Sequence, residues 1–142
     1  MKSNKDVLGS VIKTAQMGVV GIRSVAPYAV NVALQEELRS EKREYERIEQ
    51  LGHEIAAARG WETKELPGTA KLFSNVCARS QLMFGRTDSK IAAMMINGNT
   101  RGVIKGLKNM HHSPGRDHAV ASLSQKLLDT ENENIRKLQG YV

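Results

Sequence analysis

The stretch LLDTENENIRKLQG, residues 127–140, decides the kind of fold that this chain can adopt. Apolar residues recur at helical spacing through it and before it, which predicts an amphipathic helix with one face in a core. They are Val120, Leu123, Leu127, Ile135 and Leu138. Glu131 and Asn134 interrupt this face three residues apart. A carboxyl group and an amide on a core face indicate either a set of metal ligands or an internal hydrogen-bond network.

The composition of the chain favours helices packed on helices. Of its 142 residues, 40% are hydrophobic, 25% are charged and only 4% are aromatic. Leu, Ile, Val, Met and Ala must therefore fill the interior, whereas β-sandwiches use aromatic and β-branched residues. A chain of this length makes one domain, so we treat residues 1–142 as a single unit. The one cysteine, Cys77, excludes an internal disulfide bond and a Cys-rich metal site.

Neither a signal peptide nor a membrane span is predicted. Lys13 and Arg23 leave only nine residues between them, which is too short for the apolar centre of a signal peptide. No stretch approaches the roughly 18 to 20 uncharged apolar residues that cross a membrane. We therefore expect a soluble, cytoplasmic protein.

Breaks in the helical pattern divide the chain into five segments. The three prolines, Pro27, Pro67 and Pro114, all fall at expected helix boundaries. The pattern predicts helices at about residues 4–24, 28–59, 69–84, 89–110 and 117–139. Gly60 should end the second helix, and Thr87 or Asp88 should cap the fourth. The four longer helices predict an all-α, up-down-up-down bundle, with the short helix as an extra element in the second connection.

Three glycines lie one helical turn apart in the stretch GNTRGVIKG, at Gly98, Gly102 and Gly106. Each costs a helix about 1 kcal/mol relative to alanine, so a compensating contact is expected. We predict that the backbone of a neighbouring helix approaches closely at this stripe.

Four blocks of the sequence resemble one protein family. They are AQMGVVGIRSV (15–25), LQEELRSEKREYERI (34–48), SKIAAMMINGNTRGVIKGL (89–107) and DTENENIRKL (129–138). They are similar to a group of ferritin-like four-helix proteins of unknown function in spore-forming bacteria, and the likeness covers residues 5–138. It rests on helix order and short blocks, not on a catalytic signature. The resemblance implies a ferritin-like bundle, and the wider superfamily often binds two irons through Glu residues and Glu-x-x-His pairs.

Three glutamates could form such a metal site. At 1.5 Å per residue, Glu41 and Glu44 of the second helix are level with Glu131 if that helix runs parallel to the last one. The supporting amides would be Asn134, Asn99 and Gln16. Iron or manganese is the expected metal for such ligands. A di-iron centre needs about four carboxylates and two imidazoles, however, and Asn134 stands where a Glu-x-x-His pair has its histidine. The sequence therefore predicts a degenerate metal site.

The missing imidazoles favour a hydrogen-bond network over a metal centre, with Tyr45 or Arg47 as a further partner. We accordingly expect a non-catalytic structural or interaction protein and not an enzyme. The alternative is a redox or storage protein that binds iron or manganese through Glu41, Glu44 and Glu131. A single hard cation held by carboxylates and amides is a variant of that alternative.

Charge is unevenly distributed along the chain, whose net charge is +6. Residues 28–68 contain six basic and nine acidic side chains, and residues 69–116 contain eight basic and one acidic. A basic face could bind nucleic acid, but these cations form no run and few aromatic residues accompany them. We expect instead that the acidic second helix pairs with the basic region, within one bundle or between copies. A homo-oligomer is therefore the expected state.

Overall fold

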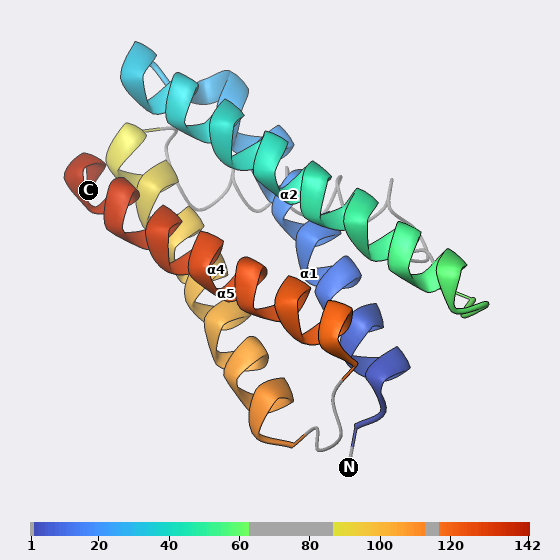
Figure 1. Ribbon diagram of the computed structural model, residues 1–142. Helices are drawn as coiled ribbons and strands as arrows, with labels where there is room; N and C mark the ends of the chain where they lie inside the picture. Colours follow the sequence, from blue (N-terminus) through green and yellow to red (C-terminus); the bar gives the residue numbers. More distant parts are fainter. Residues whose placement is uncertain (1, 63–86, 113–116) are drawn as a thin grey trace.

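The computed structural model describes residues 2–62, 87–112 and 117–142 (Figure 1). These residues form four long helices packed as a bundle, which confirms the all-α, four-helix prediction. The helices are α1 (Asn4–Val25), α2 (Val32–Ala58), α4 (Asp88–His111) and α5 (His118–Leu138). Short 3-10 turns follow α1 at Ala26–Tyr28 and α5 at Gln139–Tyr141. The short helix predicted at residues 69–84 lies outside the described residues.

Local side-chain chemistry sets where the helices begin and end. The Asn31 and Asp117 side chains accept hydrogen bonds from the first backbone N–H groups of α2 and α5. Thr87 caps α4 by accepting from the N–H of Lys90. Gly60 follows α2 with a φ of +67°, a left-handed conformation that glycine adopts without steric cost. The predicted boundaries at Gly60 and Thr87 are confirmed.

Contacts at the two ends of the bundle fix the directions of the helices. At one end, the Asp88 carboxylate accepts hydrogen bonds of 2.8 Å from the N–H groups of Val30 and Asn31, which joins the start of α4 to the start of α2. At the other end, the Arg59 guanidinium, just after α2, donates to the Asp117 carboxylate, just before α5. α2 and α4 therefore run parallel, and α1 and α5 run the opposite way (Figure 1).

This order is up-down-down-up, so the predicted up-down-up-down topology is wrong. The chain leaves α2 at one end of the bundle and begins α4 at the other. Helical periodicity carries no information on direction, and the residues between α2 and α4 are numerous enough to join either pair of ends. The site is little affected by this reversal, because Glu131 lies near the middle of the bundle. Tyr45 of α2 contacts Glu131, and Glu44, the preceding residue, is at nearly the same height but on another face of the helix.

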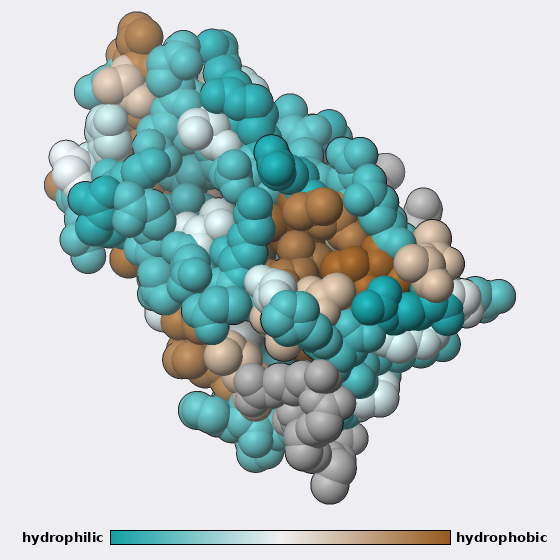
Figure 2. Space-filling view, viewed as in Figure 1, coloured by the Kyte–Doolittle hydropathy of each residue, from teal (hydrophilic) through white to brown (hydrophobic). Residues whose placement is uncertain are grey.

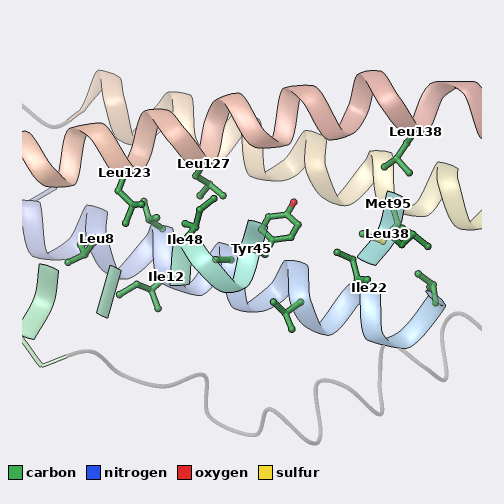
Figure 3. Close-up of a cluster of buried hydrophobic side chains, with 14 of the residues drawn as sticks. Leu8, Ile12, Ile22, Leu38, Tyr45, Ile48, Met95, Leu123, Leu127 and Leu138 are labelled. Atoms are coloured by element: carbon green, nitrogen blue, oxygen red, sulfur yellow. The ribbon is translucent and has the colours of Figure 1, made fainter. Parts of the chain in front are cut away.

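Apolar side chains of all four helices fill the interior (Figure 3). The core includes Leu8, Ile12 and Ile22 of α1, Leu38 and Ile48 of α2, Met95 of α4, and Leu123, Leu127 and Leu138 of α5. Each buried Leu or Ile contributes roughly 1.5–3 kcal/mol relative to an exposed one. The apolar stripe predicted for residues 120–138 is buried, with Ile135 half-buried at its margin. Burial of these stripes is the main force that holds the four helices together.

The outer surface is mainly polar. On the face formed by α2 and α5, hydrophilic side chains predominate, and apolar ones are visible in the hollow between the two helices (Figure 2). No helix in the described part of the chain is long and apolar enough to cross a membrane. α2 and α4 lie at opposite corners of the bundle, so the acidic α2 is not the packing partner of the basic α4. Charge pairing between copies stays a prediction, which sedimentation at several salt concentrations can test.

The topology can be tested by cross-linking pairs of introduced cysteines after replacing Cys77 with serine. Val30→Cys with Asp88→Cys places two thiols at the same end of the bundle, because the Val30 N–H contacts the Asp88 side chain. We expect a short bismaleimide to join them efficiently, as measured by peptide mapping.

The control pair is Arg59→Cys with Asp88→Cys. An up-down-up-down bundle would place these two residues at the same end, whereas here α2 separates them by about 40 Å at 1.5 Å per residue. Efficient cross-linking of the control pair and not of the first pair would contradict the observed topology.

Candidate functional site at the centre of the bundle

Four polar side chains meet in the middle of the bundle. Tyr45 comes from α2, Asn99 from α4, and Glu131 and Asn134 from α5; we refer to them as the central cluster. Each is at most 5% exposed. A carboxyl group and two amides are costly to bury unless they hydrogen bond, so their partners decide what the cluster can do.

A continuous chain of hydrogen bonds joins the central cluster. The Tyr45 hydroxyl donates to Asn99 Oδ1 at 2.6 Å and lies 3.2 Å from Glu131 Oε2. Asn134 Nδ2 donates to the same Asn99 oxygen at 3.2 Å. Asn99 Nδ2 donates to the backbone carbonyl of Met95 at 2.8 Å. The predicted network is therefore present, with Tyr45 as its partner from α2.

The arrangement of donors indicates that Glu131 is neutral. Tyr45 has one hydroxyl proton, and Asn99 Oδ1 is its closer acceptor. The contact with Glu131 Oε2 is then a hydrogen bond only if the carboxyl group donates. Burial raises the pKa of Glu131 from 4.5 to about 8, although the contact with Tyr45 lowers it in part. Burial, and next the charge that Glu131 carries when ionised, raise the pKa of Tyr45 well above 10. The central cluster is uncharged at neutral pH.

Two glycines leave the space that the central cluster occupies. A Cβ atom on Gly102 of α4 would lie 2.1 Å from Glu131 Oε2, so the carboxyl group packs directly on the helix backbone. A Cβ atom on Gly18 of α1 would lie 2.6 Å from the ring of Tyr45. The prediction that the backbone of a neighbouring helix approaches this glycine stripe is therefore wrong at Gly102, where the Glu131 side chain approaches instead. A Cβ atom on Gly98 would meet nothing within 4 Å.

Glu41, one of the predicted metal ligands, is a second buried acid. Its side chain is 2% exposed, and no N–H group of the described residues is within hydrogen-bond distance of its carboxyl oxygens. Burial, a hydrogen bond with Glu37 and the charge of Glu37 raise the pKa of Glu41 to about 9, while Lys137 lowers it. Two carboxyl groups can hydrogen bond only through a proton, so Glu41 donates to Glu37. Lys137 Nζ lies 4.0 Å from the other side of this pair, at Glu37 Oε1.

The other predicted ligands are dispersed. Glu44 is half-buried on α2, and Gln16 Nε2 donates to Glu49 Oε2 at 3.0 Å instead of joining the central cluster. In the described part of the chain, no three His, Cys, Asp or Glu side chains are grouped so as to hold a metal ion. The structure therefore brings Glu131 together with the predicted amides Asn99 and Asn134, but not with Glu44. Glu44 is next to Tyr45 along α2 and so at nearly the same height, but it lies on another face of the helix.

A cavity of about 500 Å³ opens beside the central cluster, between α1 and α4. These two helices pack less closely than α1 with α2 or α4 with α5. Tyr45, Asn99 and Glu131 contribute to its floor. Glu131 Oε1 has no hydrogen-bond partner among the described residues. This oxygen is itself buried against Gly102, so it is an unsatisfied acceptor just beneath the cavity floor.

The molecule is thus an all-α four-helix bundle with a buried polar centre and a side cavity. Comparison of the chain with protein-family models, curated proteins and solved structures finds no match. The sequence pattern did not predict the cavity. A signal was present, since glycines recur in both QMGVVG of α1 and INGNTRG of α4. Two glycine-rich helix faces that oppose each other leave space where other side chains would meet.

Replacing Glu131 with glutamine should change how stability depends on pH. In the folded wild type Glu131 keeps its proton up to about pH 8, whereas the unfolded chain releases it above pH 4.5. The stability that this proton contributes is therefore complete below pH 4.5 and is lost as the pH rises through 8. Glutamine can donate to Tyr45 in the same way but does not titrate. The free energy of unfolding of Glu131→Gln relative to wild type should therefore rise by up to about 1.4 kcal/mol per pH unit between 4.5 and 8.

Denaturant titrations at several pH values measure this difference. Glu133→Gln, on the same helix but partly exposed and paired with Arg136, should show no such rise. A pH-independent difference for Glu131→Gln would contradict a neutral carboxyl group. If a chelator lowered the stability of the wild type but not that of Glu131→Gln, this would indicate a bound metal instead.

Alanine substitutions of two neighbouring glycines should have opposite effects. Gly102→Ala forces Glu131 away and should destabilise the fold by about 1–3 kcal/mol, the usual cost of overpacking. Gly106→Ala places a Cβ atom at an ordinary 3.8 Å from Leu128 and should stabilise α4 by up to about 1 kcal/mol. Thermal melts compare the two variants, and equal effects would show that the Gly102 contact is unimportant.

Proposed function

We propose that this protein is a non-catalytic, ferritin-like bundle that binds a small molecule in the cavity between α1 and α4. The cavity is the observation that carries the proposal. Its volume of about 500 Å³ suits a small ligand, and fixed polar groups stand on its floor. Methionines form much of its wall, and an apolar wall with a few fixed polar groups is typical of a small-molecule site.

The directions of the helices support the ferritin-like part of the proposal. Ferritin-like bundles contain one long crossover connection, and this chain leaves α2 and begins α4 at opposite ends. The four sequence blocks that resemble ferritin-like proteins lie within α1, α2, α4 and α5. Glu131 and Asn134 stand at the i, i+3 positions where di-iron members carry a Glu-x-x-His pair.

The chemistry of the central cluster supports a binding role. A general base has to be ionised to accept a proton, whereas burial keeps Glu131 protonated at neutral pH. Tyr45 and Asn99 are occupied with each other at 2.6 Å. We therefore expect these fixed and neutral groups to orient a bound molecule, since none of them is an ionised base that could accept a proton from it.

The second candidate function is metal binding by carboxylates, with iron or manganese as the cation. It is favoured by Glu131 Oε1, which lacks a hydrogen-bond partner among the described residues, and by the buried Glu41, whose carboxyl oxygens accept from no N–H group there. A cation would have to displace the proton from each of these acids. Melts of wild type and Glu131→Gln with and without chelator distinguish it from the proposed function.

Filling the cavity should abolish ligand binding. A Cβ atom on Gly21 of α1 or on Gly98 of α4 meets nothing within 4 Å, and both glycines line the cavity. Gly21→Leu and Gly98→Leu should each place an isobutyl group in that space without a clash. We expect the wild type to enhance the fluorescence of phenylnaphthylamine, an uncharged dye, or of its sulfonated counterpart, anilinonaphthalene sulfonate, and both variants to lose most of this signal.

Gly9→Leu is the matched control. Gly9 also lies on α1 with open space around its Cβ position, but it does not line the cavity, so this variant should bind as the wild type does. Circular dichroism excludes dye binding by a loosened core. Absence of a signal with both dyes in the wild type, or an equal signal in all variants, would refute the proposed function.

A further inference from the structure

The cavity carries an unbalanced positive charge. Lys13 of α1 and Arg101 and Lys105 of α4 all line it. Lys13 and Arg101 are exposed and Lys105 is half-buried, so they stand where the cavity opens to solvent. No carboxylate of the described residues forms an ion pair with any of the three.

Lys105 lies close to other cations. Partial burial, and then the charges of Lys13 and Lys2, lower the pKa of Lys105 below 10.5. Neighbouring like charges disfavour the charged form of each group, which costs stability unless an opposite charge is present. The neutral Glu131 on the floor supplies no such charge. An anion in the cavity would remove the repulsion.

The cavity also differs in character from one end to the other. α1 and α4 run antiparallel, so Lys13 and Lys105 stand at one end, while Gly21 and Met94 stand at the other. Lys13 and Gly21 are about 12 Å apart along α1 at 1.5 Å per residue. Met17, Met94 and Met95 supply flexible apolar surface along the wall. A ligand that fits this pattern has a charged group at one end and an apolar body.

We propose that the cavity is selective for amphipathic organic anions, whose acidic group pairs with Lys13, Arg101 and Lys105 while the apolar body lies along the methionines. The inference rests on the proposed function, because it names the chemical class of the ligand for the same cavity. A purely inorganic anion would leave the apolar wall uncovered. A cationic amphiphile would add to the existing repulsion.

The two dyes test this selectivity, because they differ only in one sulfonate group. We expect the wild type to bind anilinonaphthalene sulfonate at least about tenfold more tightly than phenylnaphthylamine, which corresponds to one charge-assisted contact. The double variant Lys13→Gln with Lys105→Gln should lose this preference and bind both dyes alike. Fluorescence titrations give the dissociation constants.

Lys90→Gln is the control, since Lys90 is an exposed lysine of α4 that does not line the cavity. This variant should keep the preference for the sulfonate. Equal affinity for the two dyes in the wild type, with loss of both in Gly98→Leu, would overturn the anion selectivity and leave the proposed function standing. Binding of neither dye would overturn both.

Discussion

A carboxyl group that packs on the bare backbone of a neighbouring helix is the constraint on which the centre of this bundle depends. Glu131 of α5 rests against Gly102 of α4, where any Cβ atom would be 2.1 Å from its oxygen. The same carboxyl group must meet the hydroxyl of Tyr45 on α2. One side chain thereby fixes the relative heights of three helices, because a shift of either neighbour by one turn would leave a buried acid without a partner. Apolar packing alone tolerates such shifts far better.

The cavity follows from the same constraint. Gly18 and Gly102 are needed where the ring of Tyr45 and the carboxyl group of Glu131 approach α1 and α4. Gly21 and Gly98 continue these small-residue faces by about one turn, where no side chain of the described residues fills the space. Helices α1 and α4 meet near Ser10 and Asn109 and are separated by the cavity beside Gly21 and Gly98. Each glycine lowers the stability of its helix, but only Gly18 and Gly102 make room for a side-chain contact within the described chain. The other two leave the space in which a ligand can lie.

Much of the fold could be predicted from the sequence, and the errors concern the direction of α4 and the helix faces on which polar side chains lie. The apolar stripes, the cap at Thr87 and the stop at Gly60 are local features, and the structure confirms them. The polar interruption at Glu131 and Asn134 also identified the centre of the bundle, with Tyr45 as a partner. The direction of α4 is not a local feature, because a helix has the same periodicity when read from either end. The members of the predicted metal site lie apart for another reason: Glu44 is level with Tyr45 but lies on another face of α2, and Glu41, one turn away, pairs with Glu37. Gly102 stands out in the sequence as one of three glycines one helical turn apart. A contact between a side chain and a backbone, however, leaves no periodic signal that would identify Glu131 as its partner.

The protonation of the floor and the charge of the opening are two halves of one electrostatic arrangement. An ionised Glu131 would place a negative charge in the cavity with Lys13, Arg101 and Lys105, and would partly neutralise them from within. Burial prevents this below about pH 8, so the cations stay available to a ligand. The coupling has to be reciprocal. A bound anion disfavours a second negative charge nearby and raises the pKa of Glu131 further, which keeps its proton on the hydrogen bond to Tyr45. Ligand binding and the internal network therefore stabilise each other, although no charged group of the ligand needs to touch the central cluster.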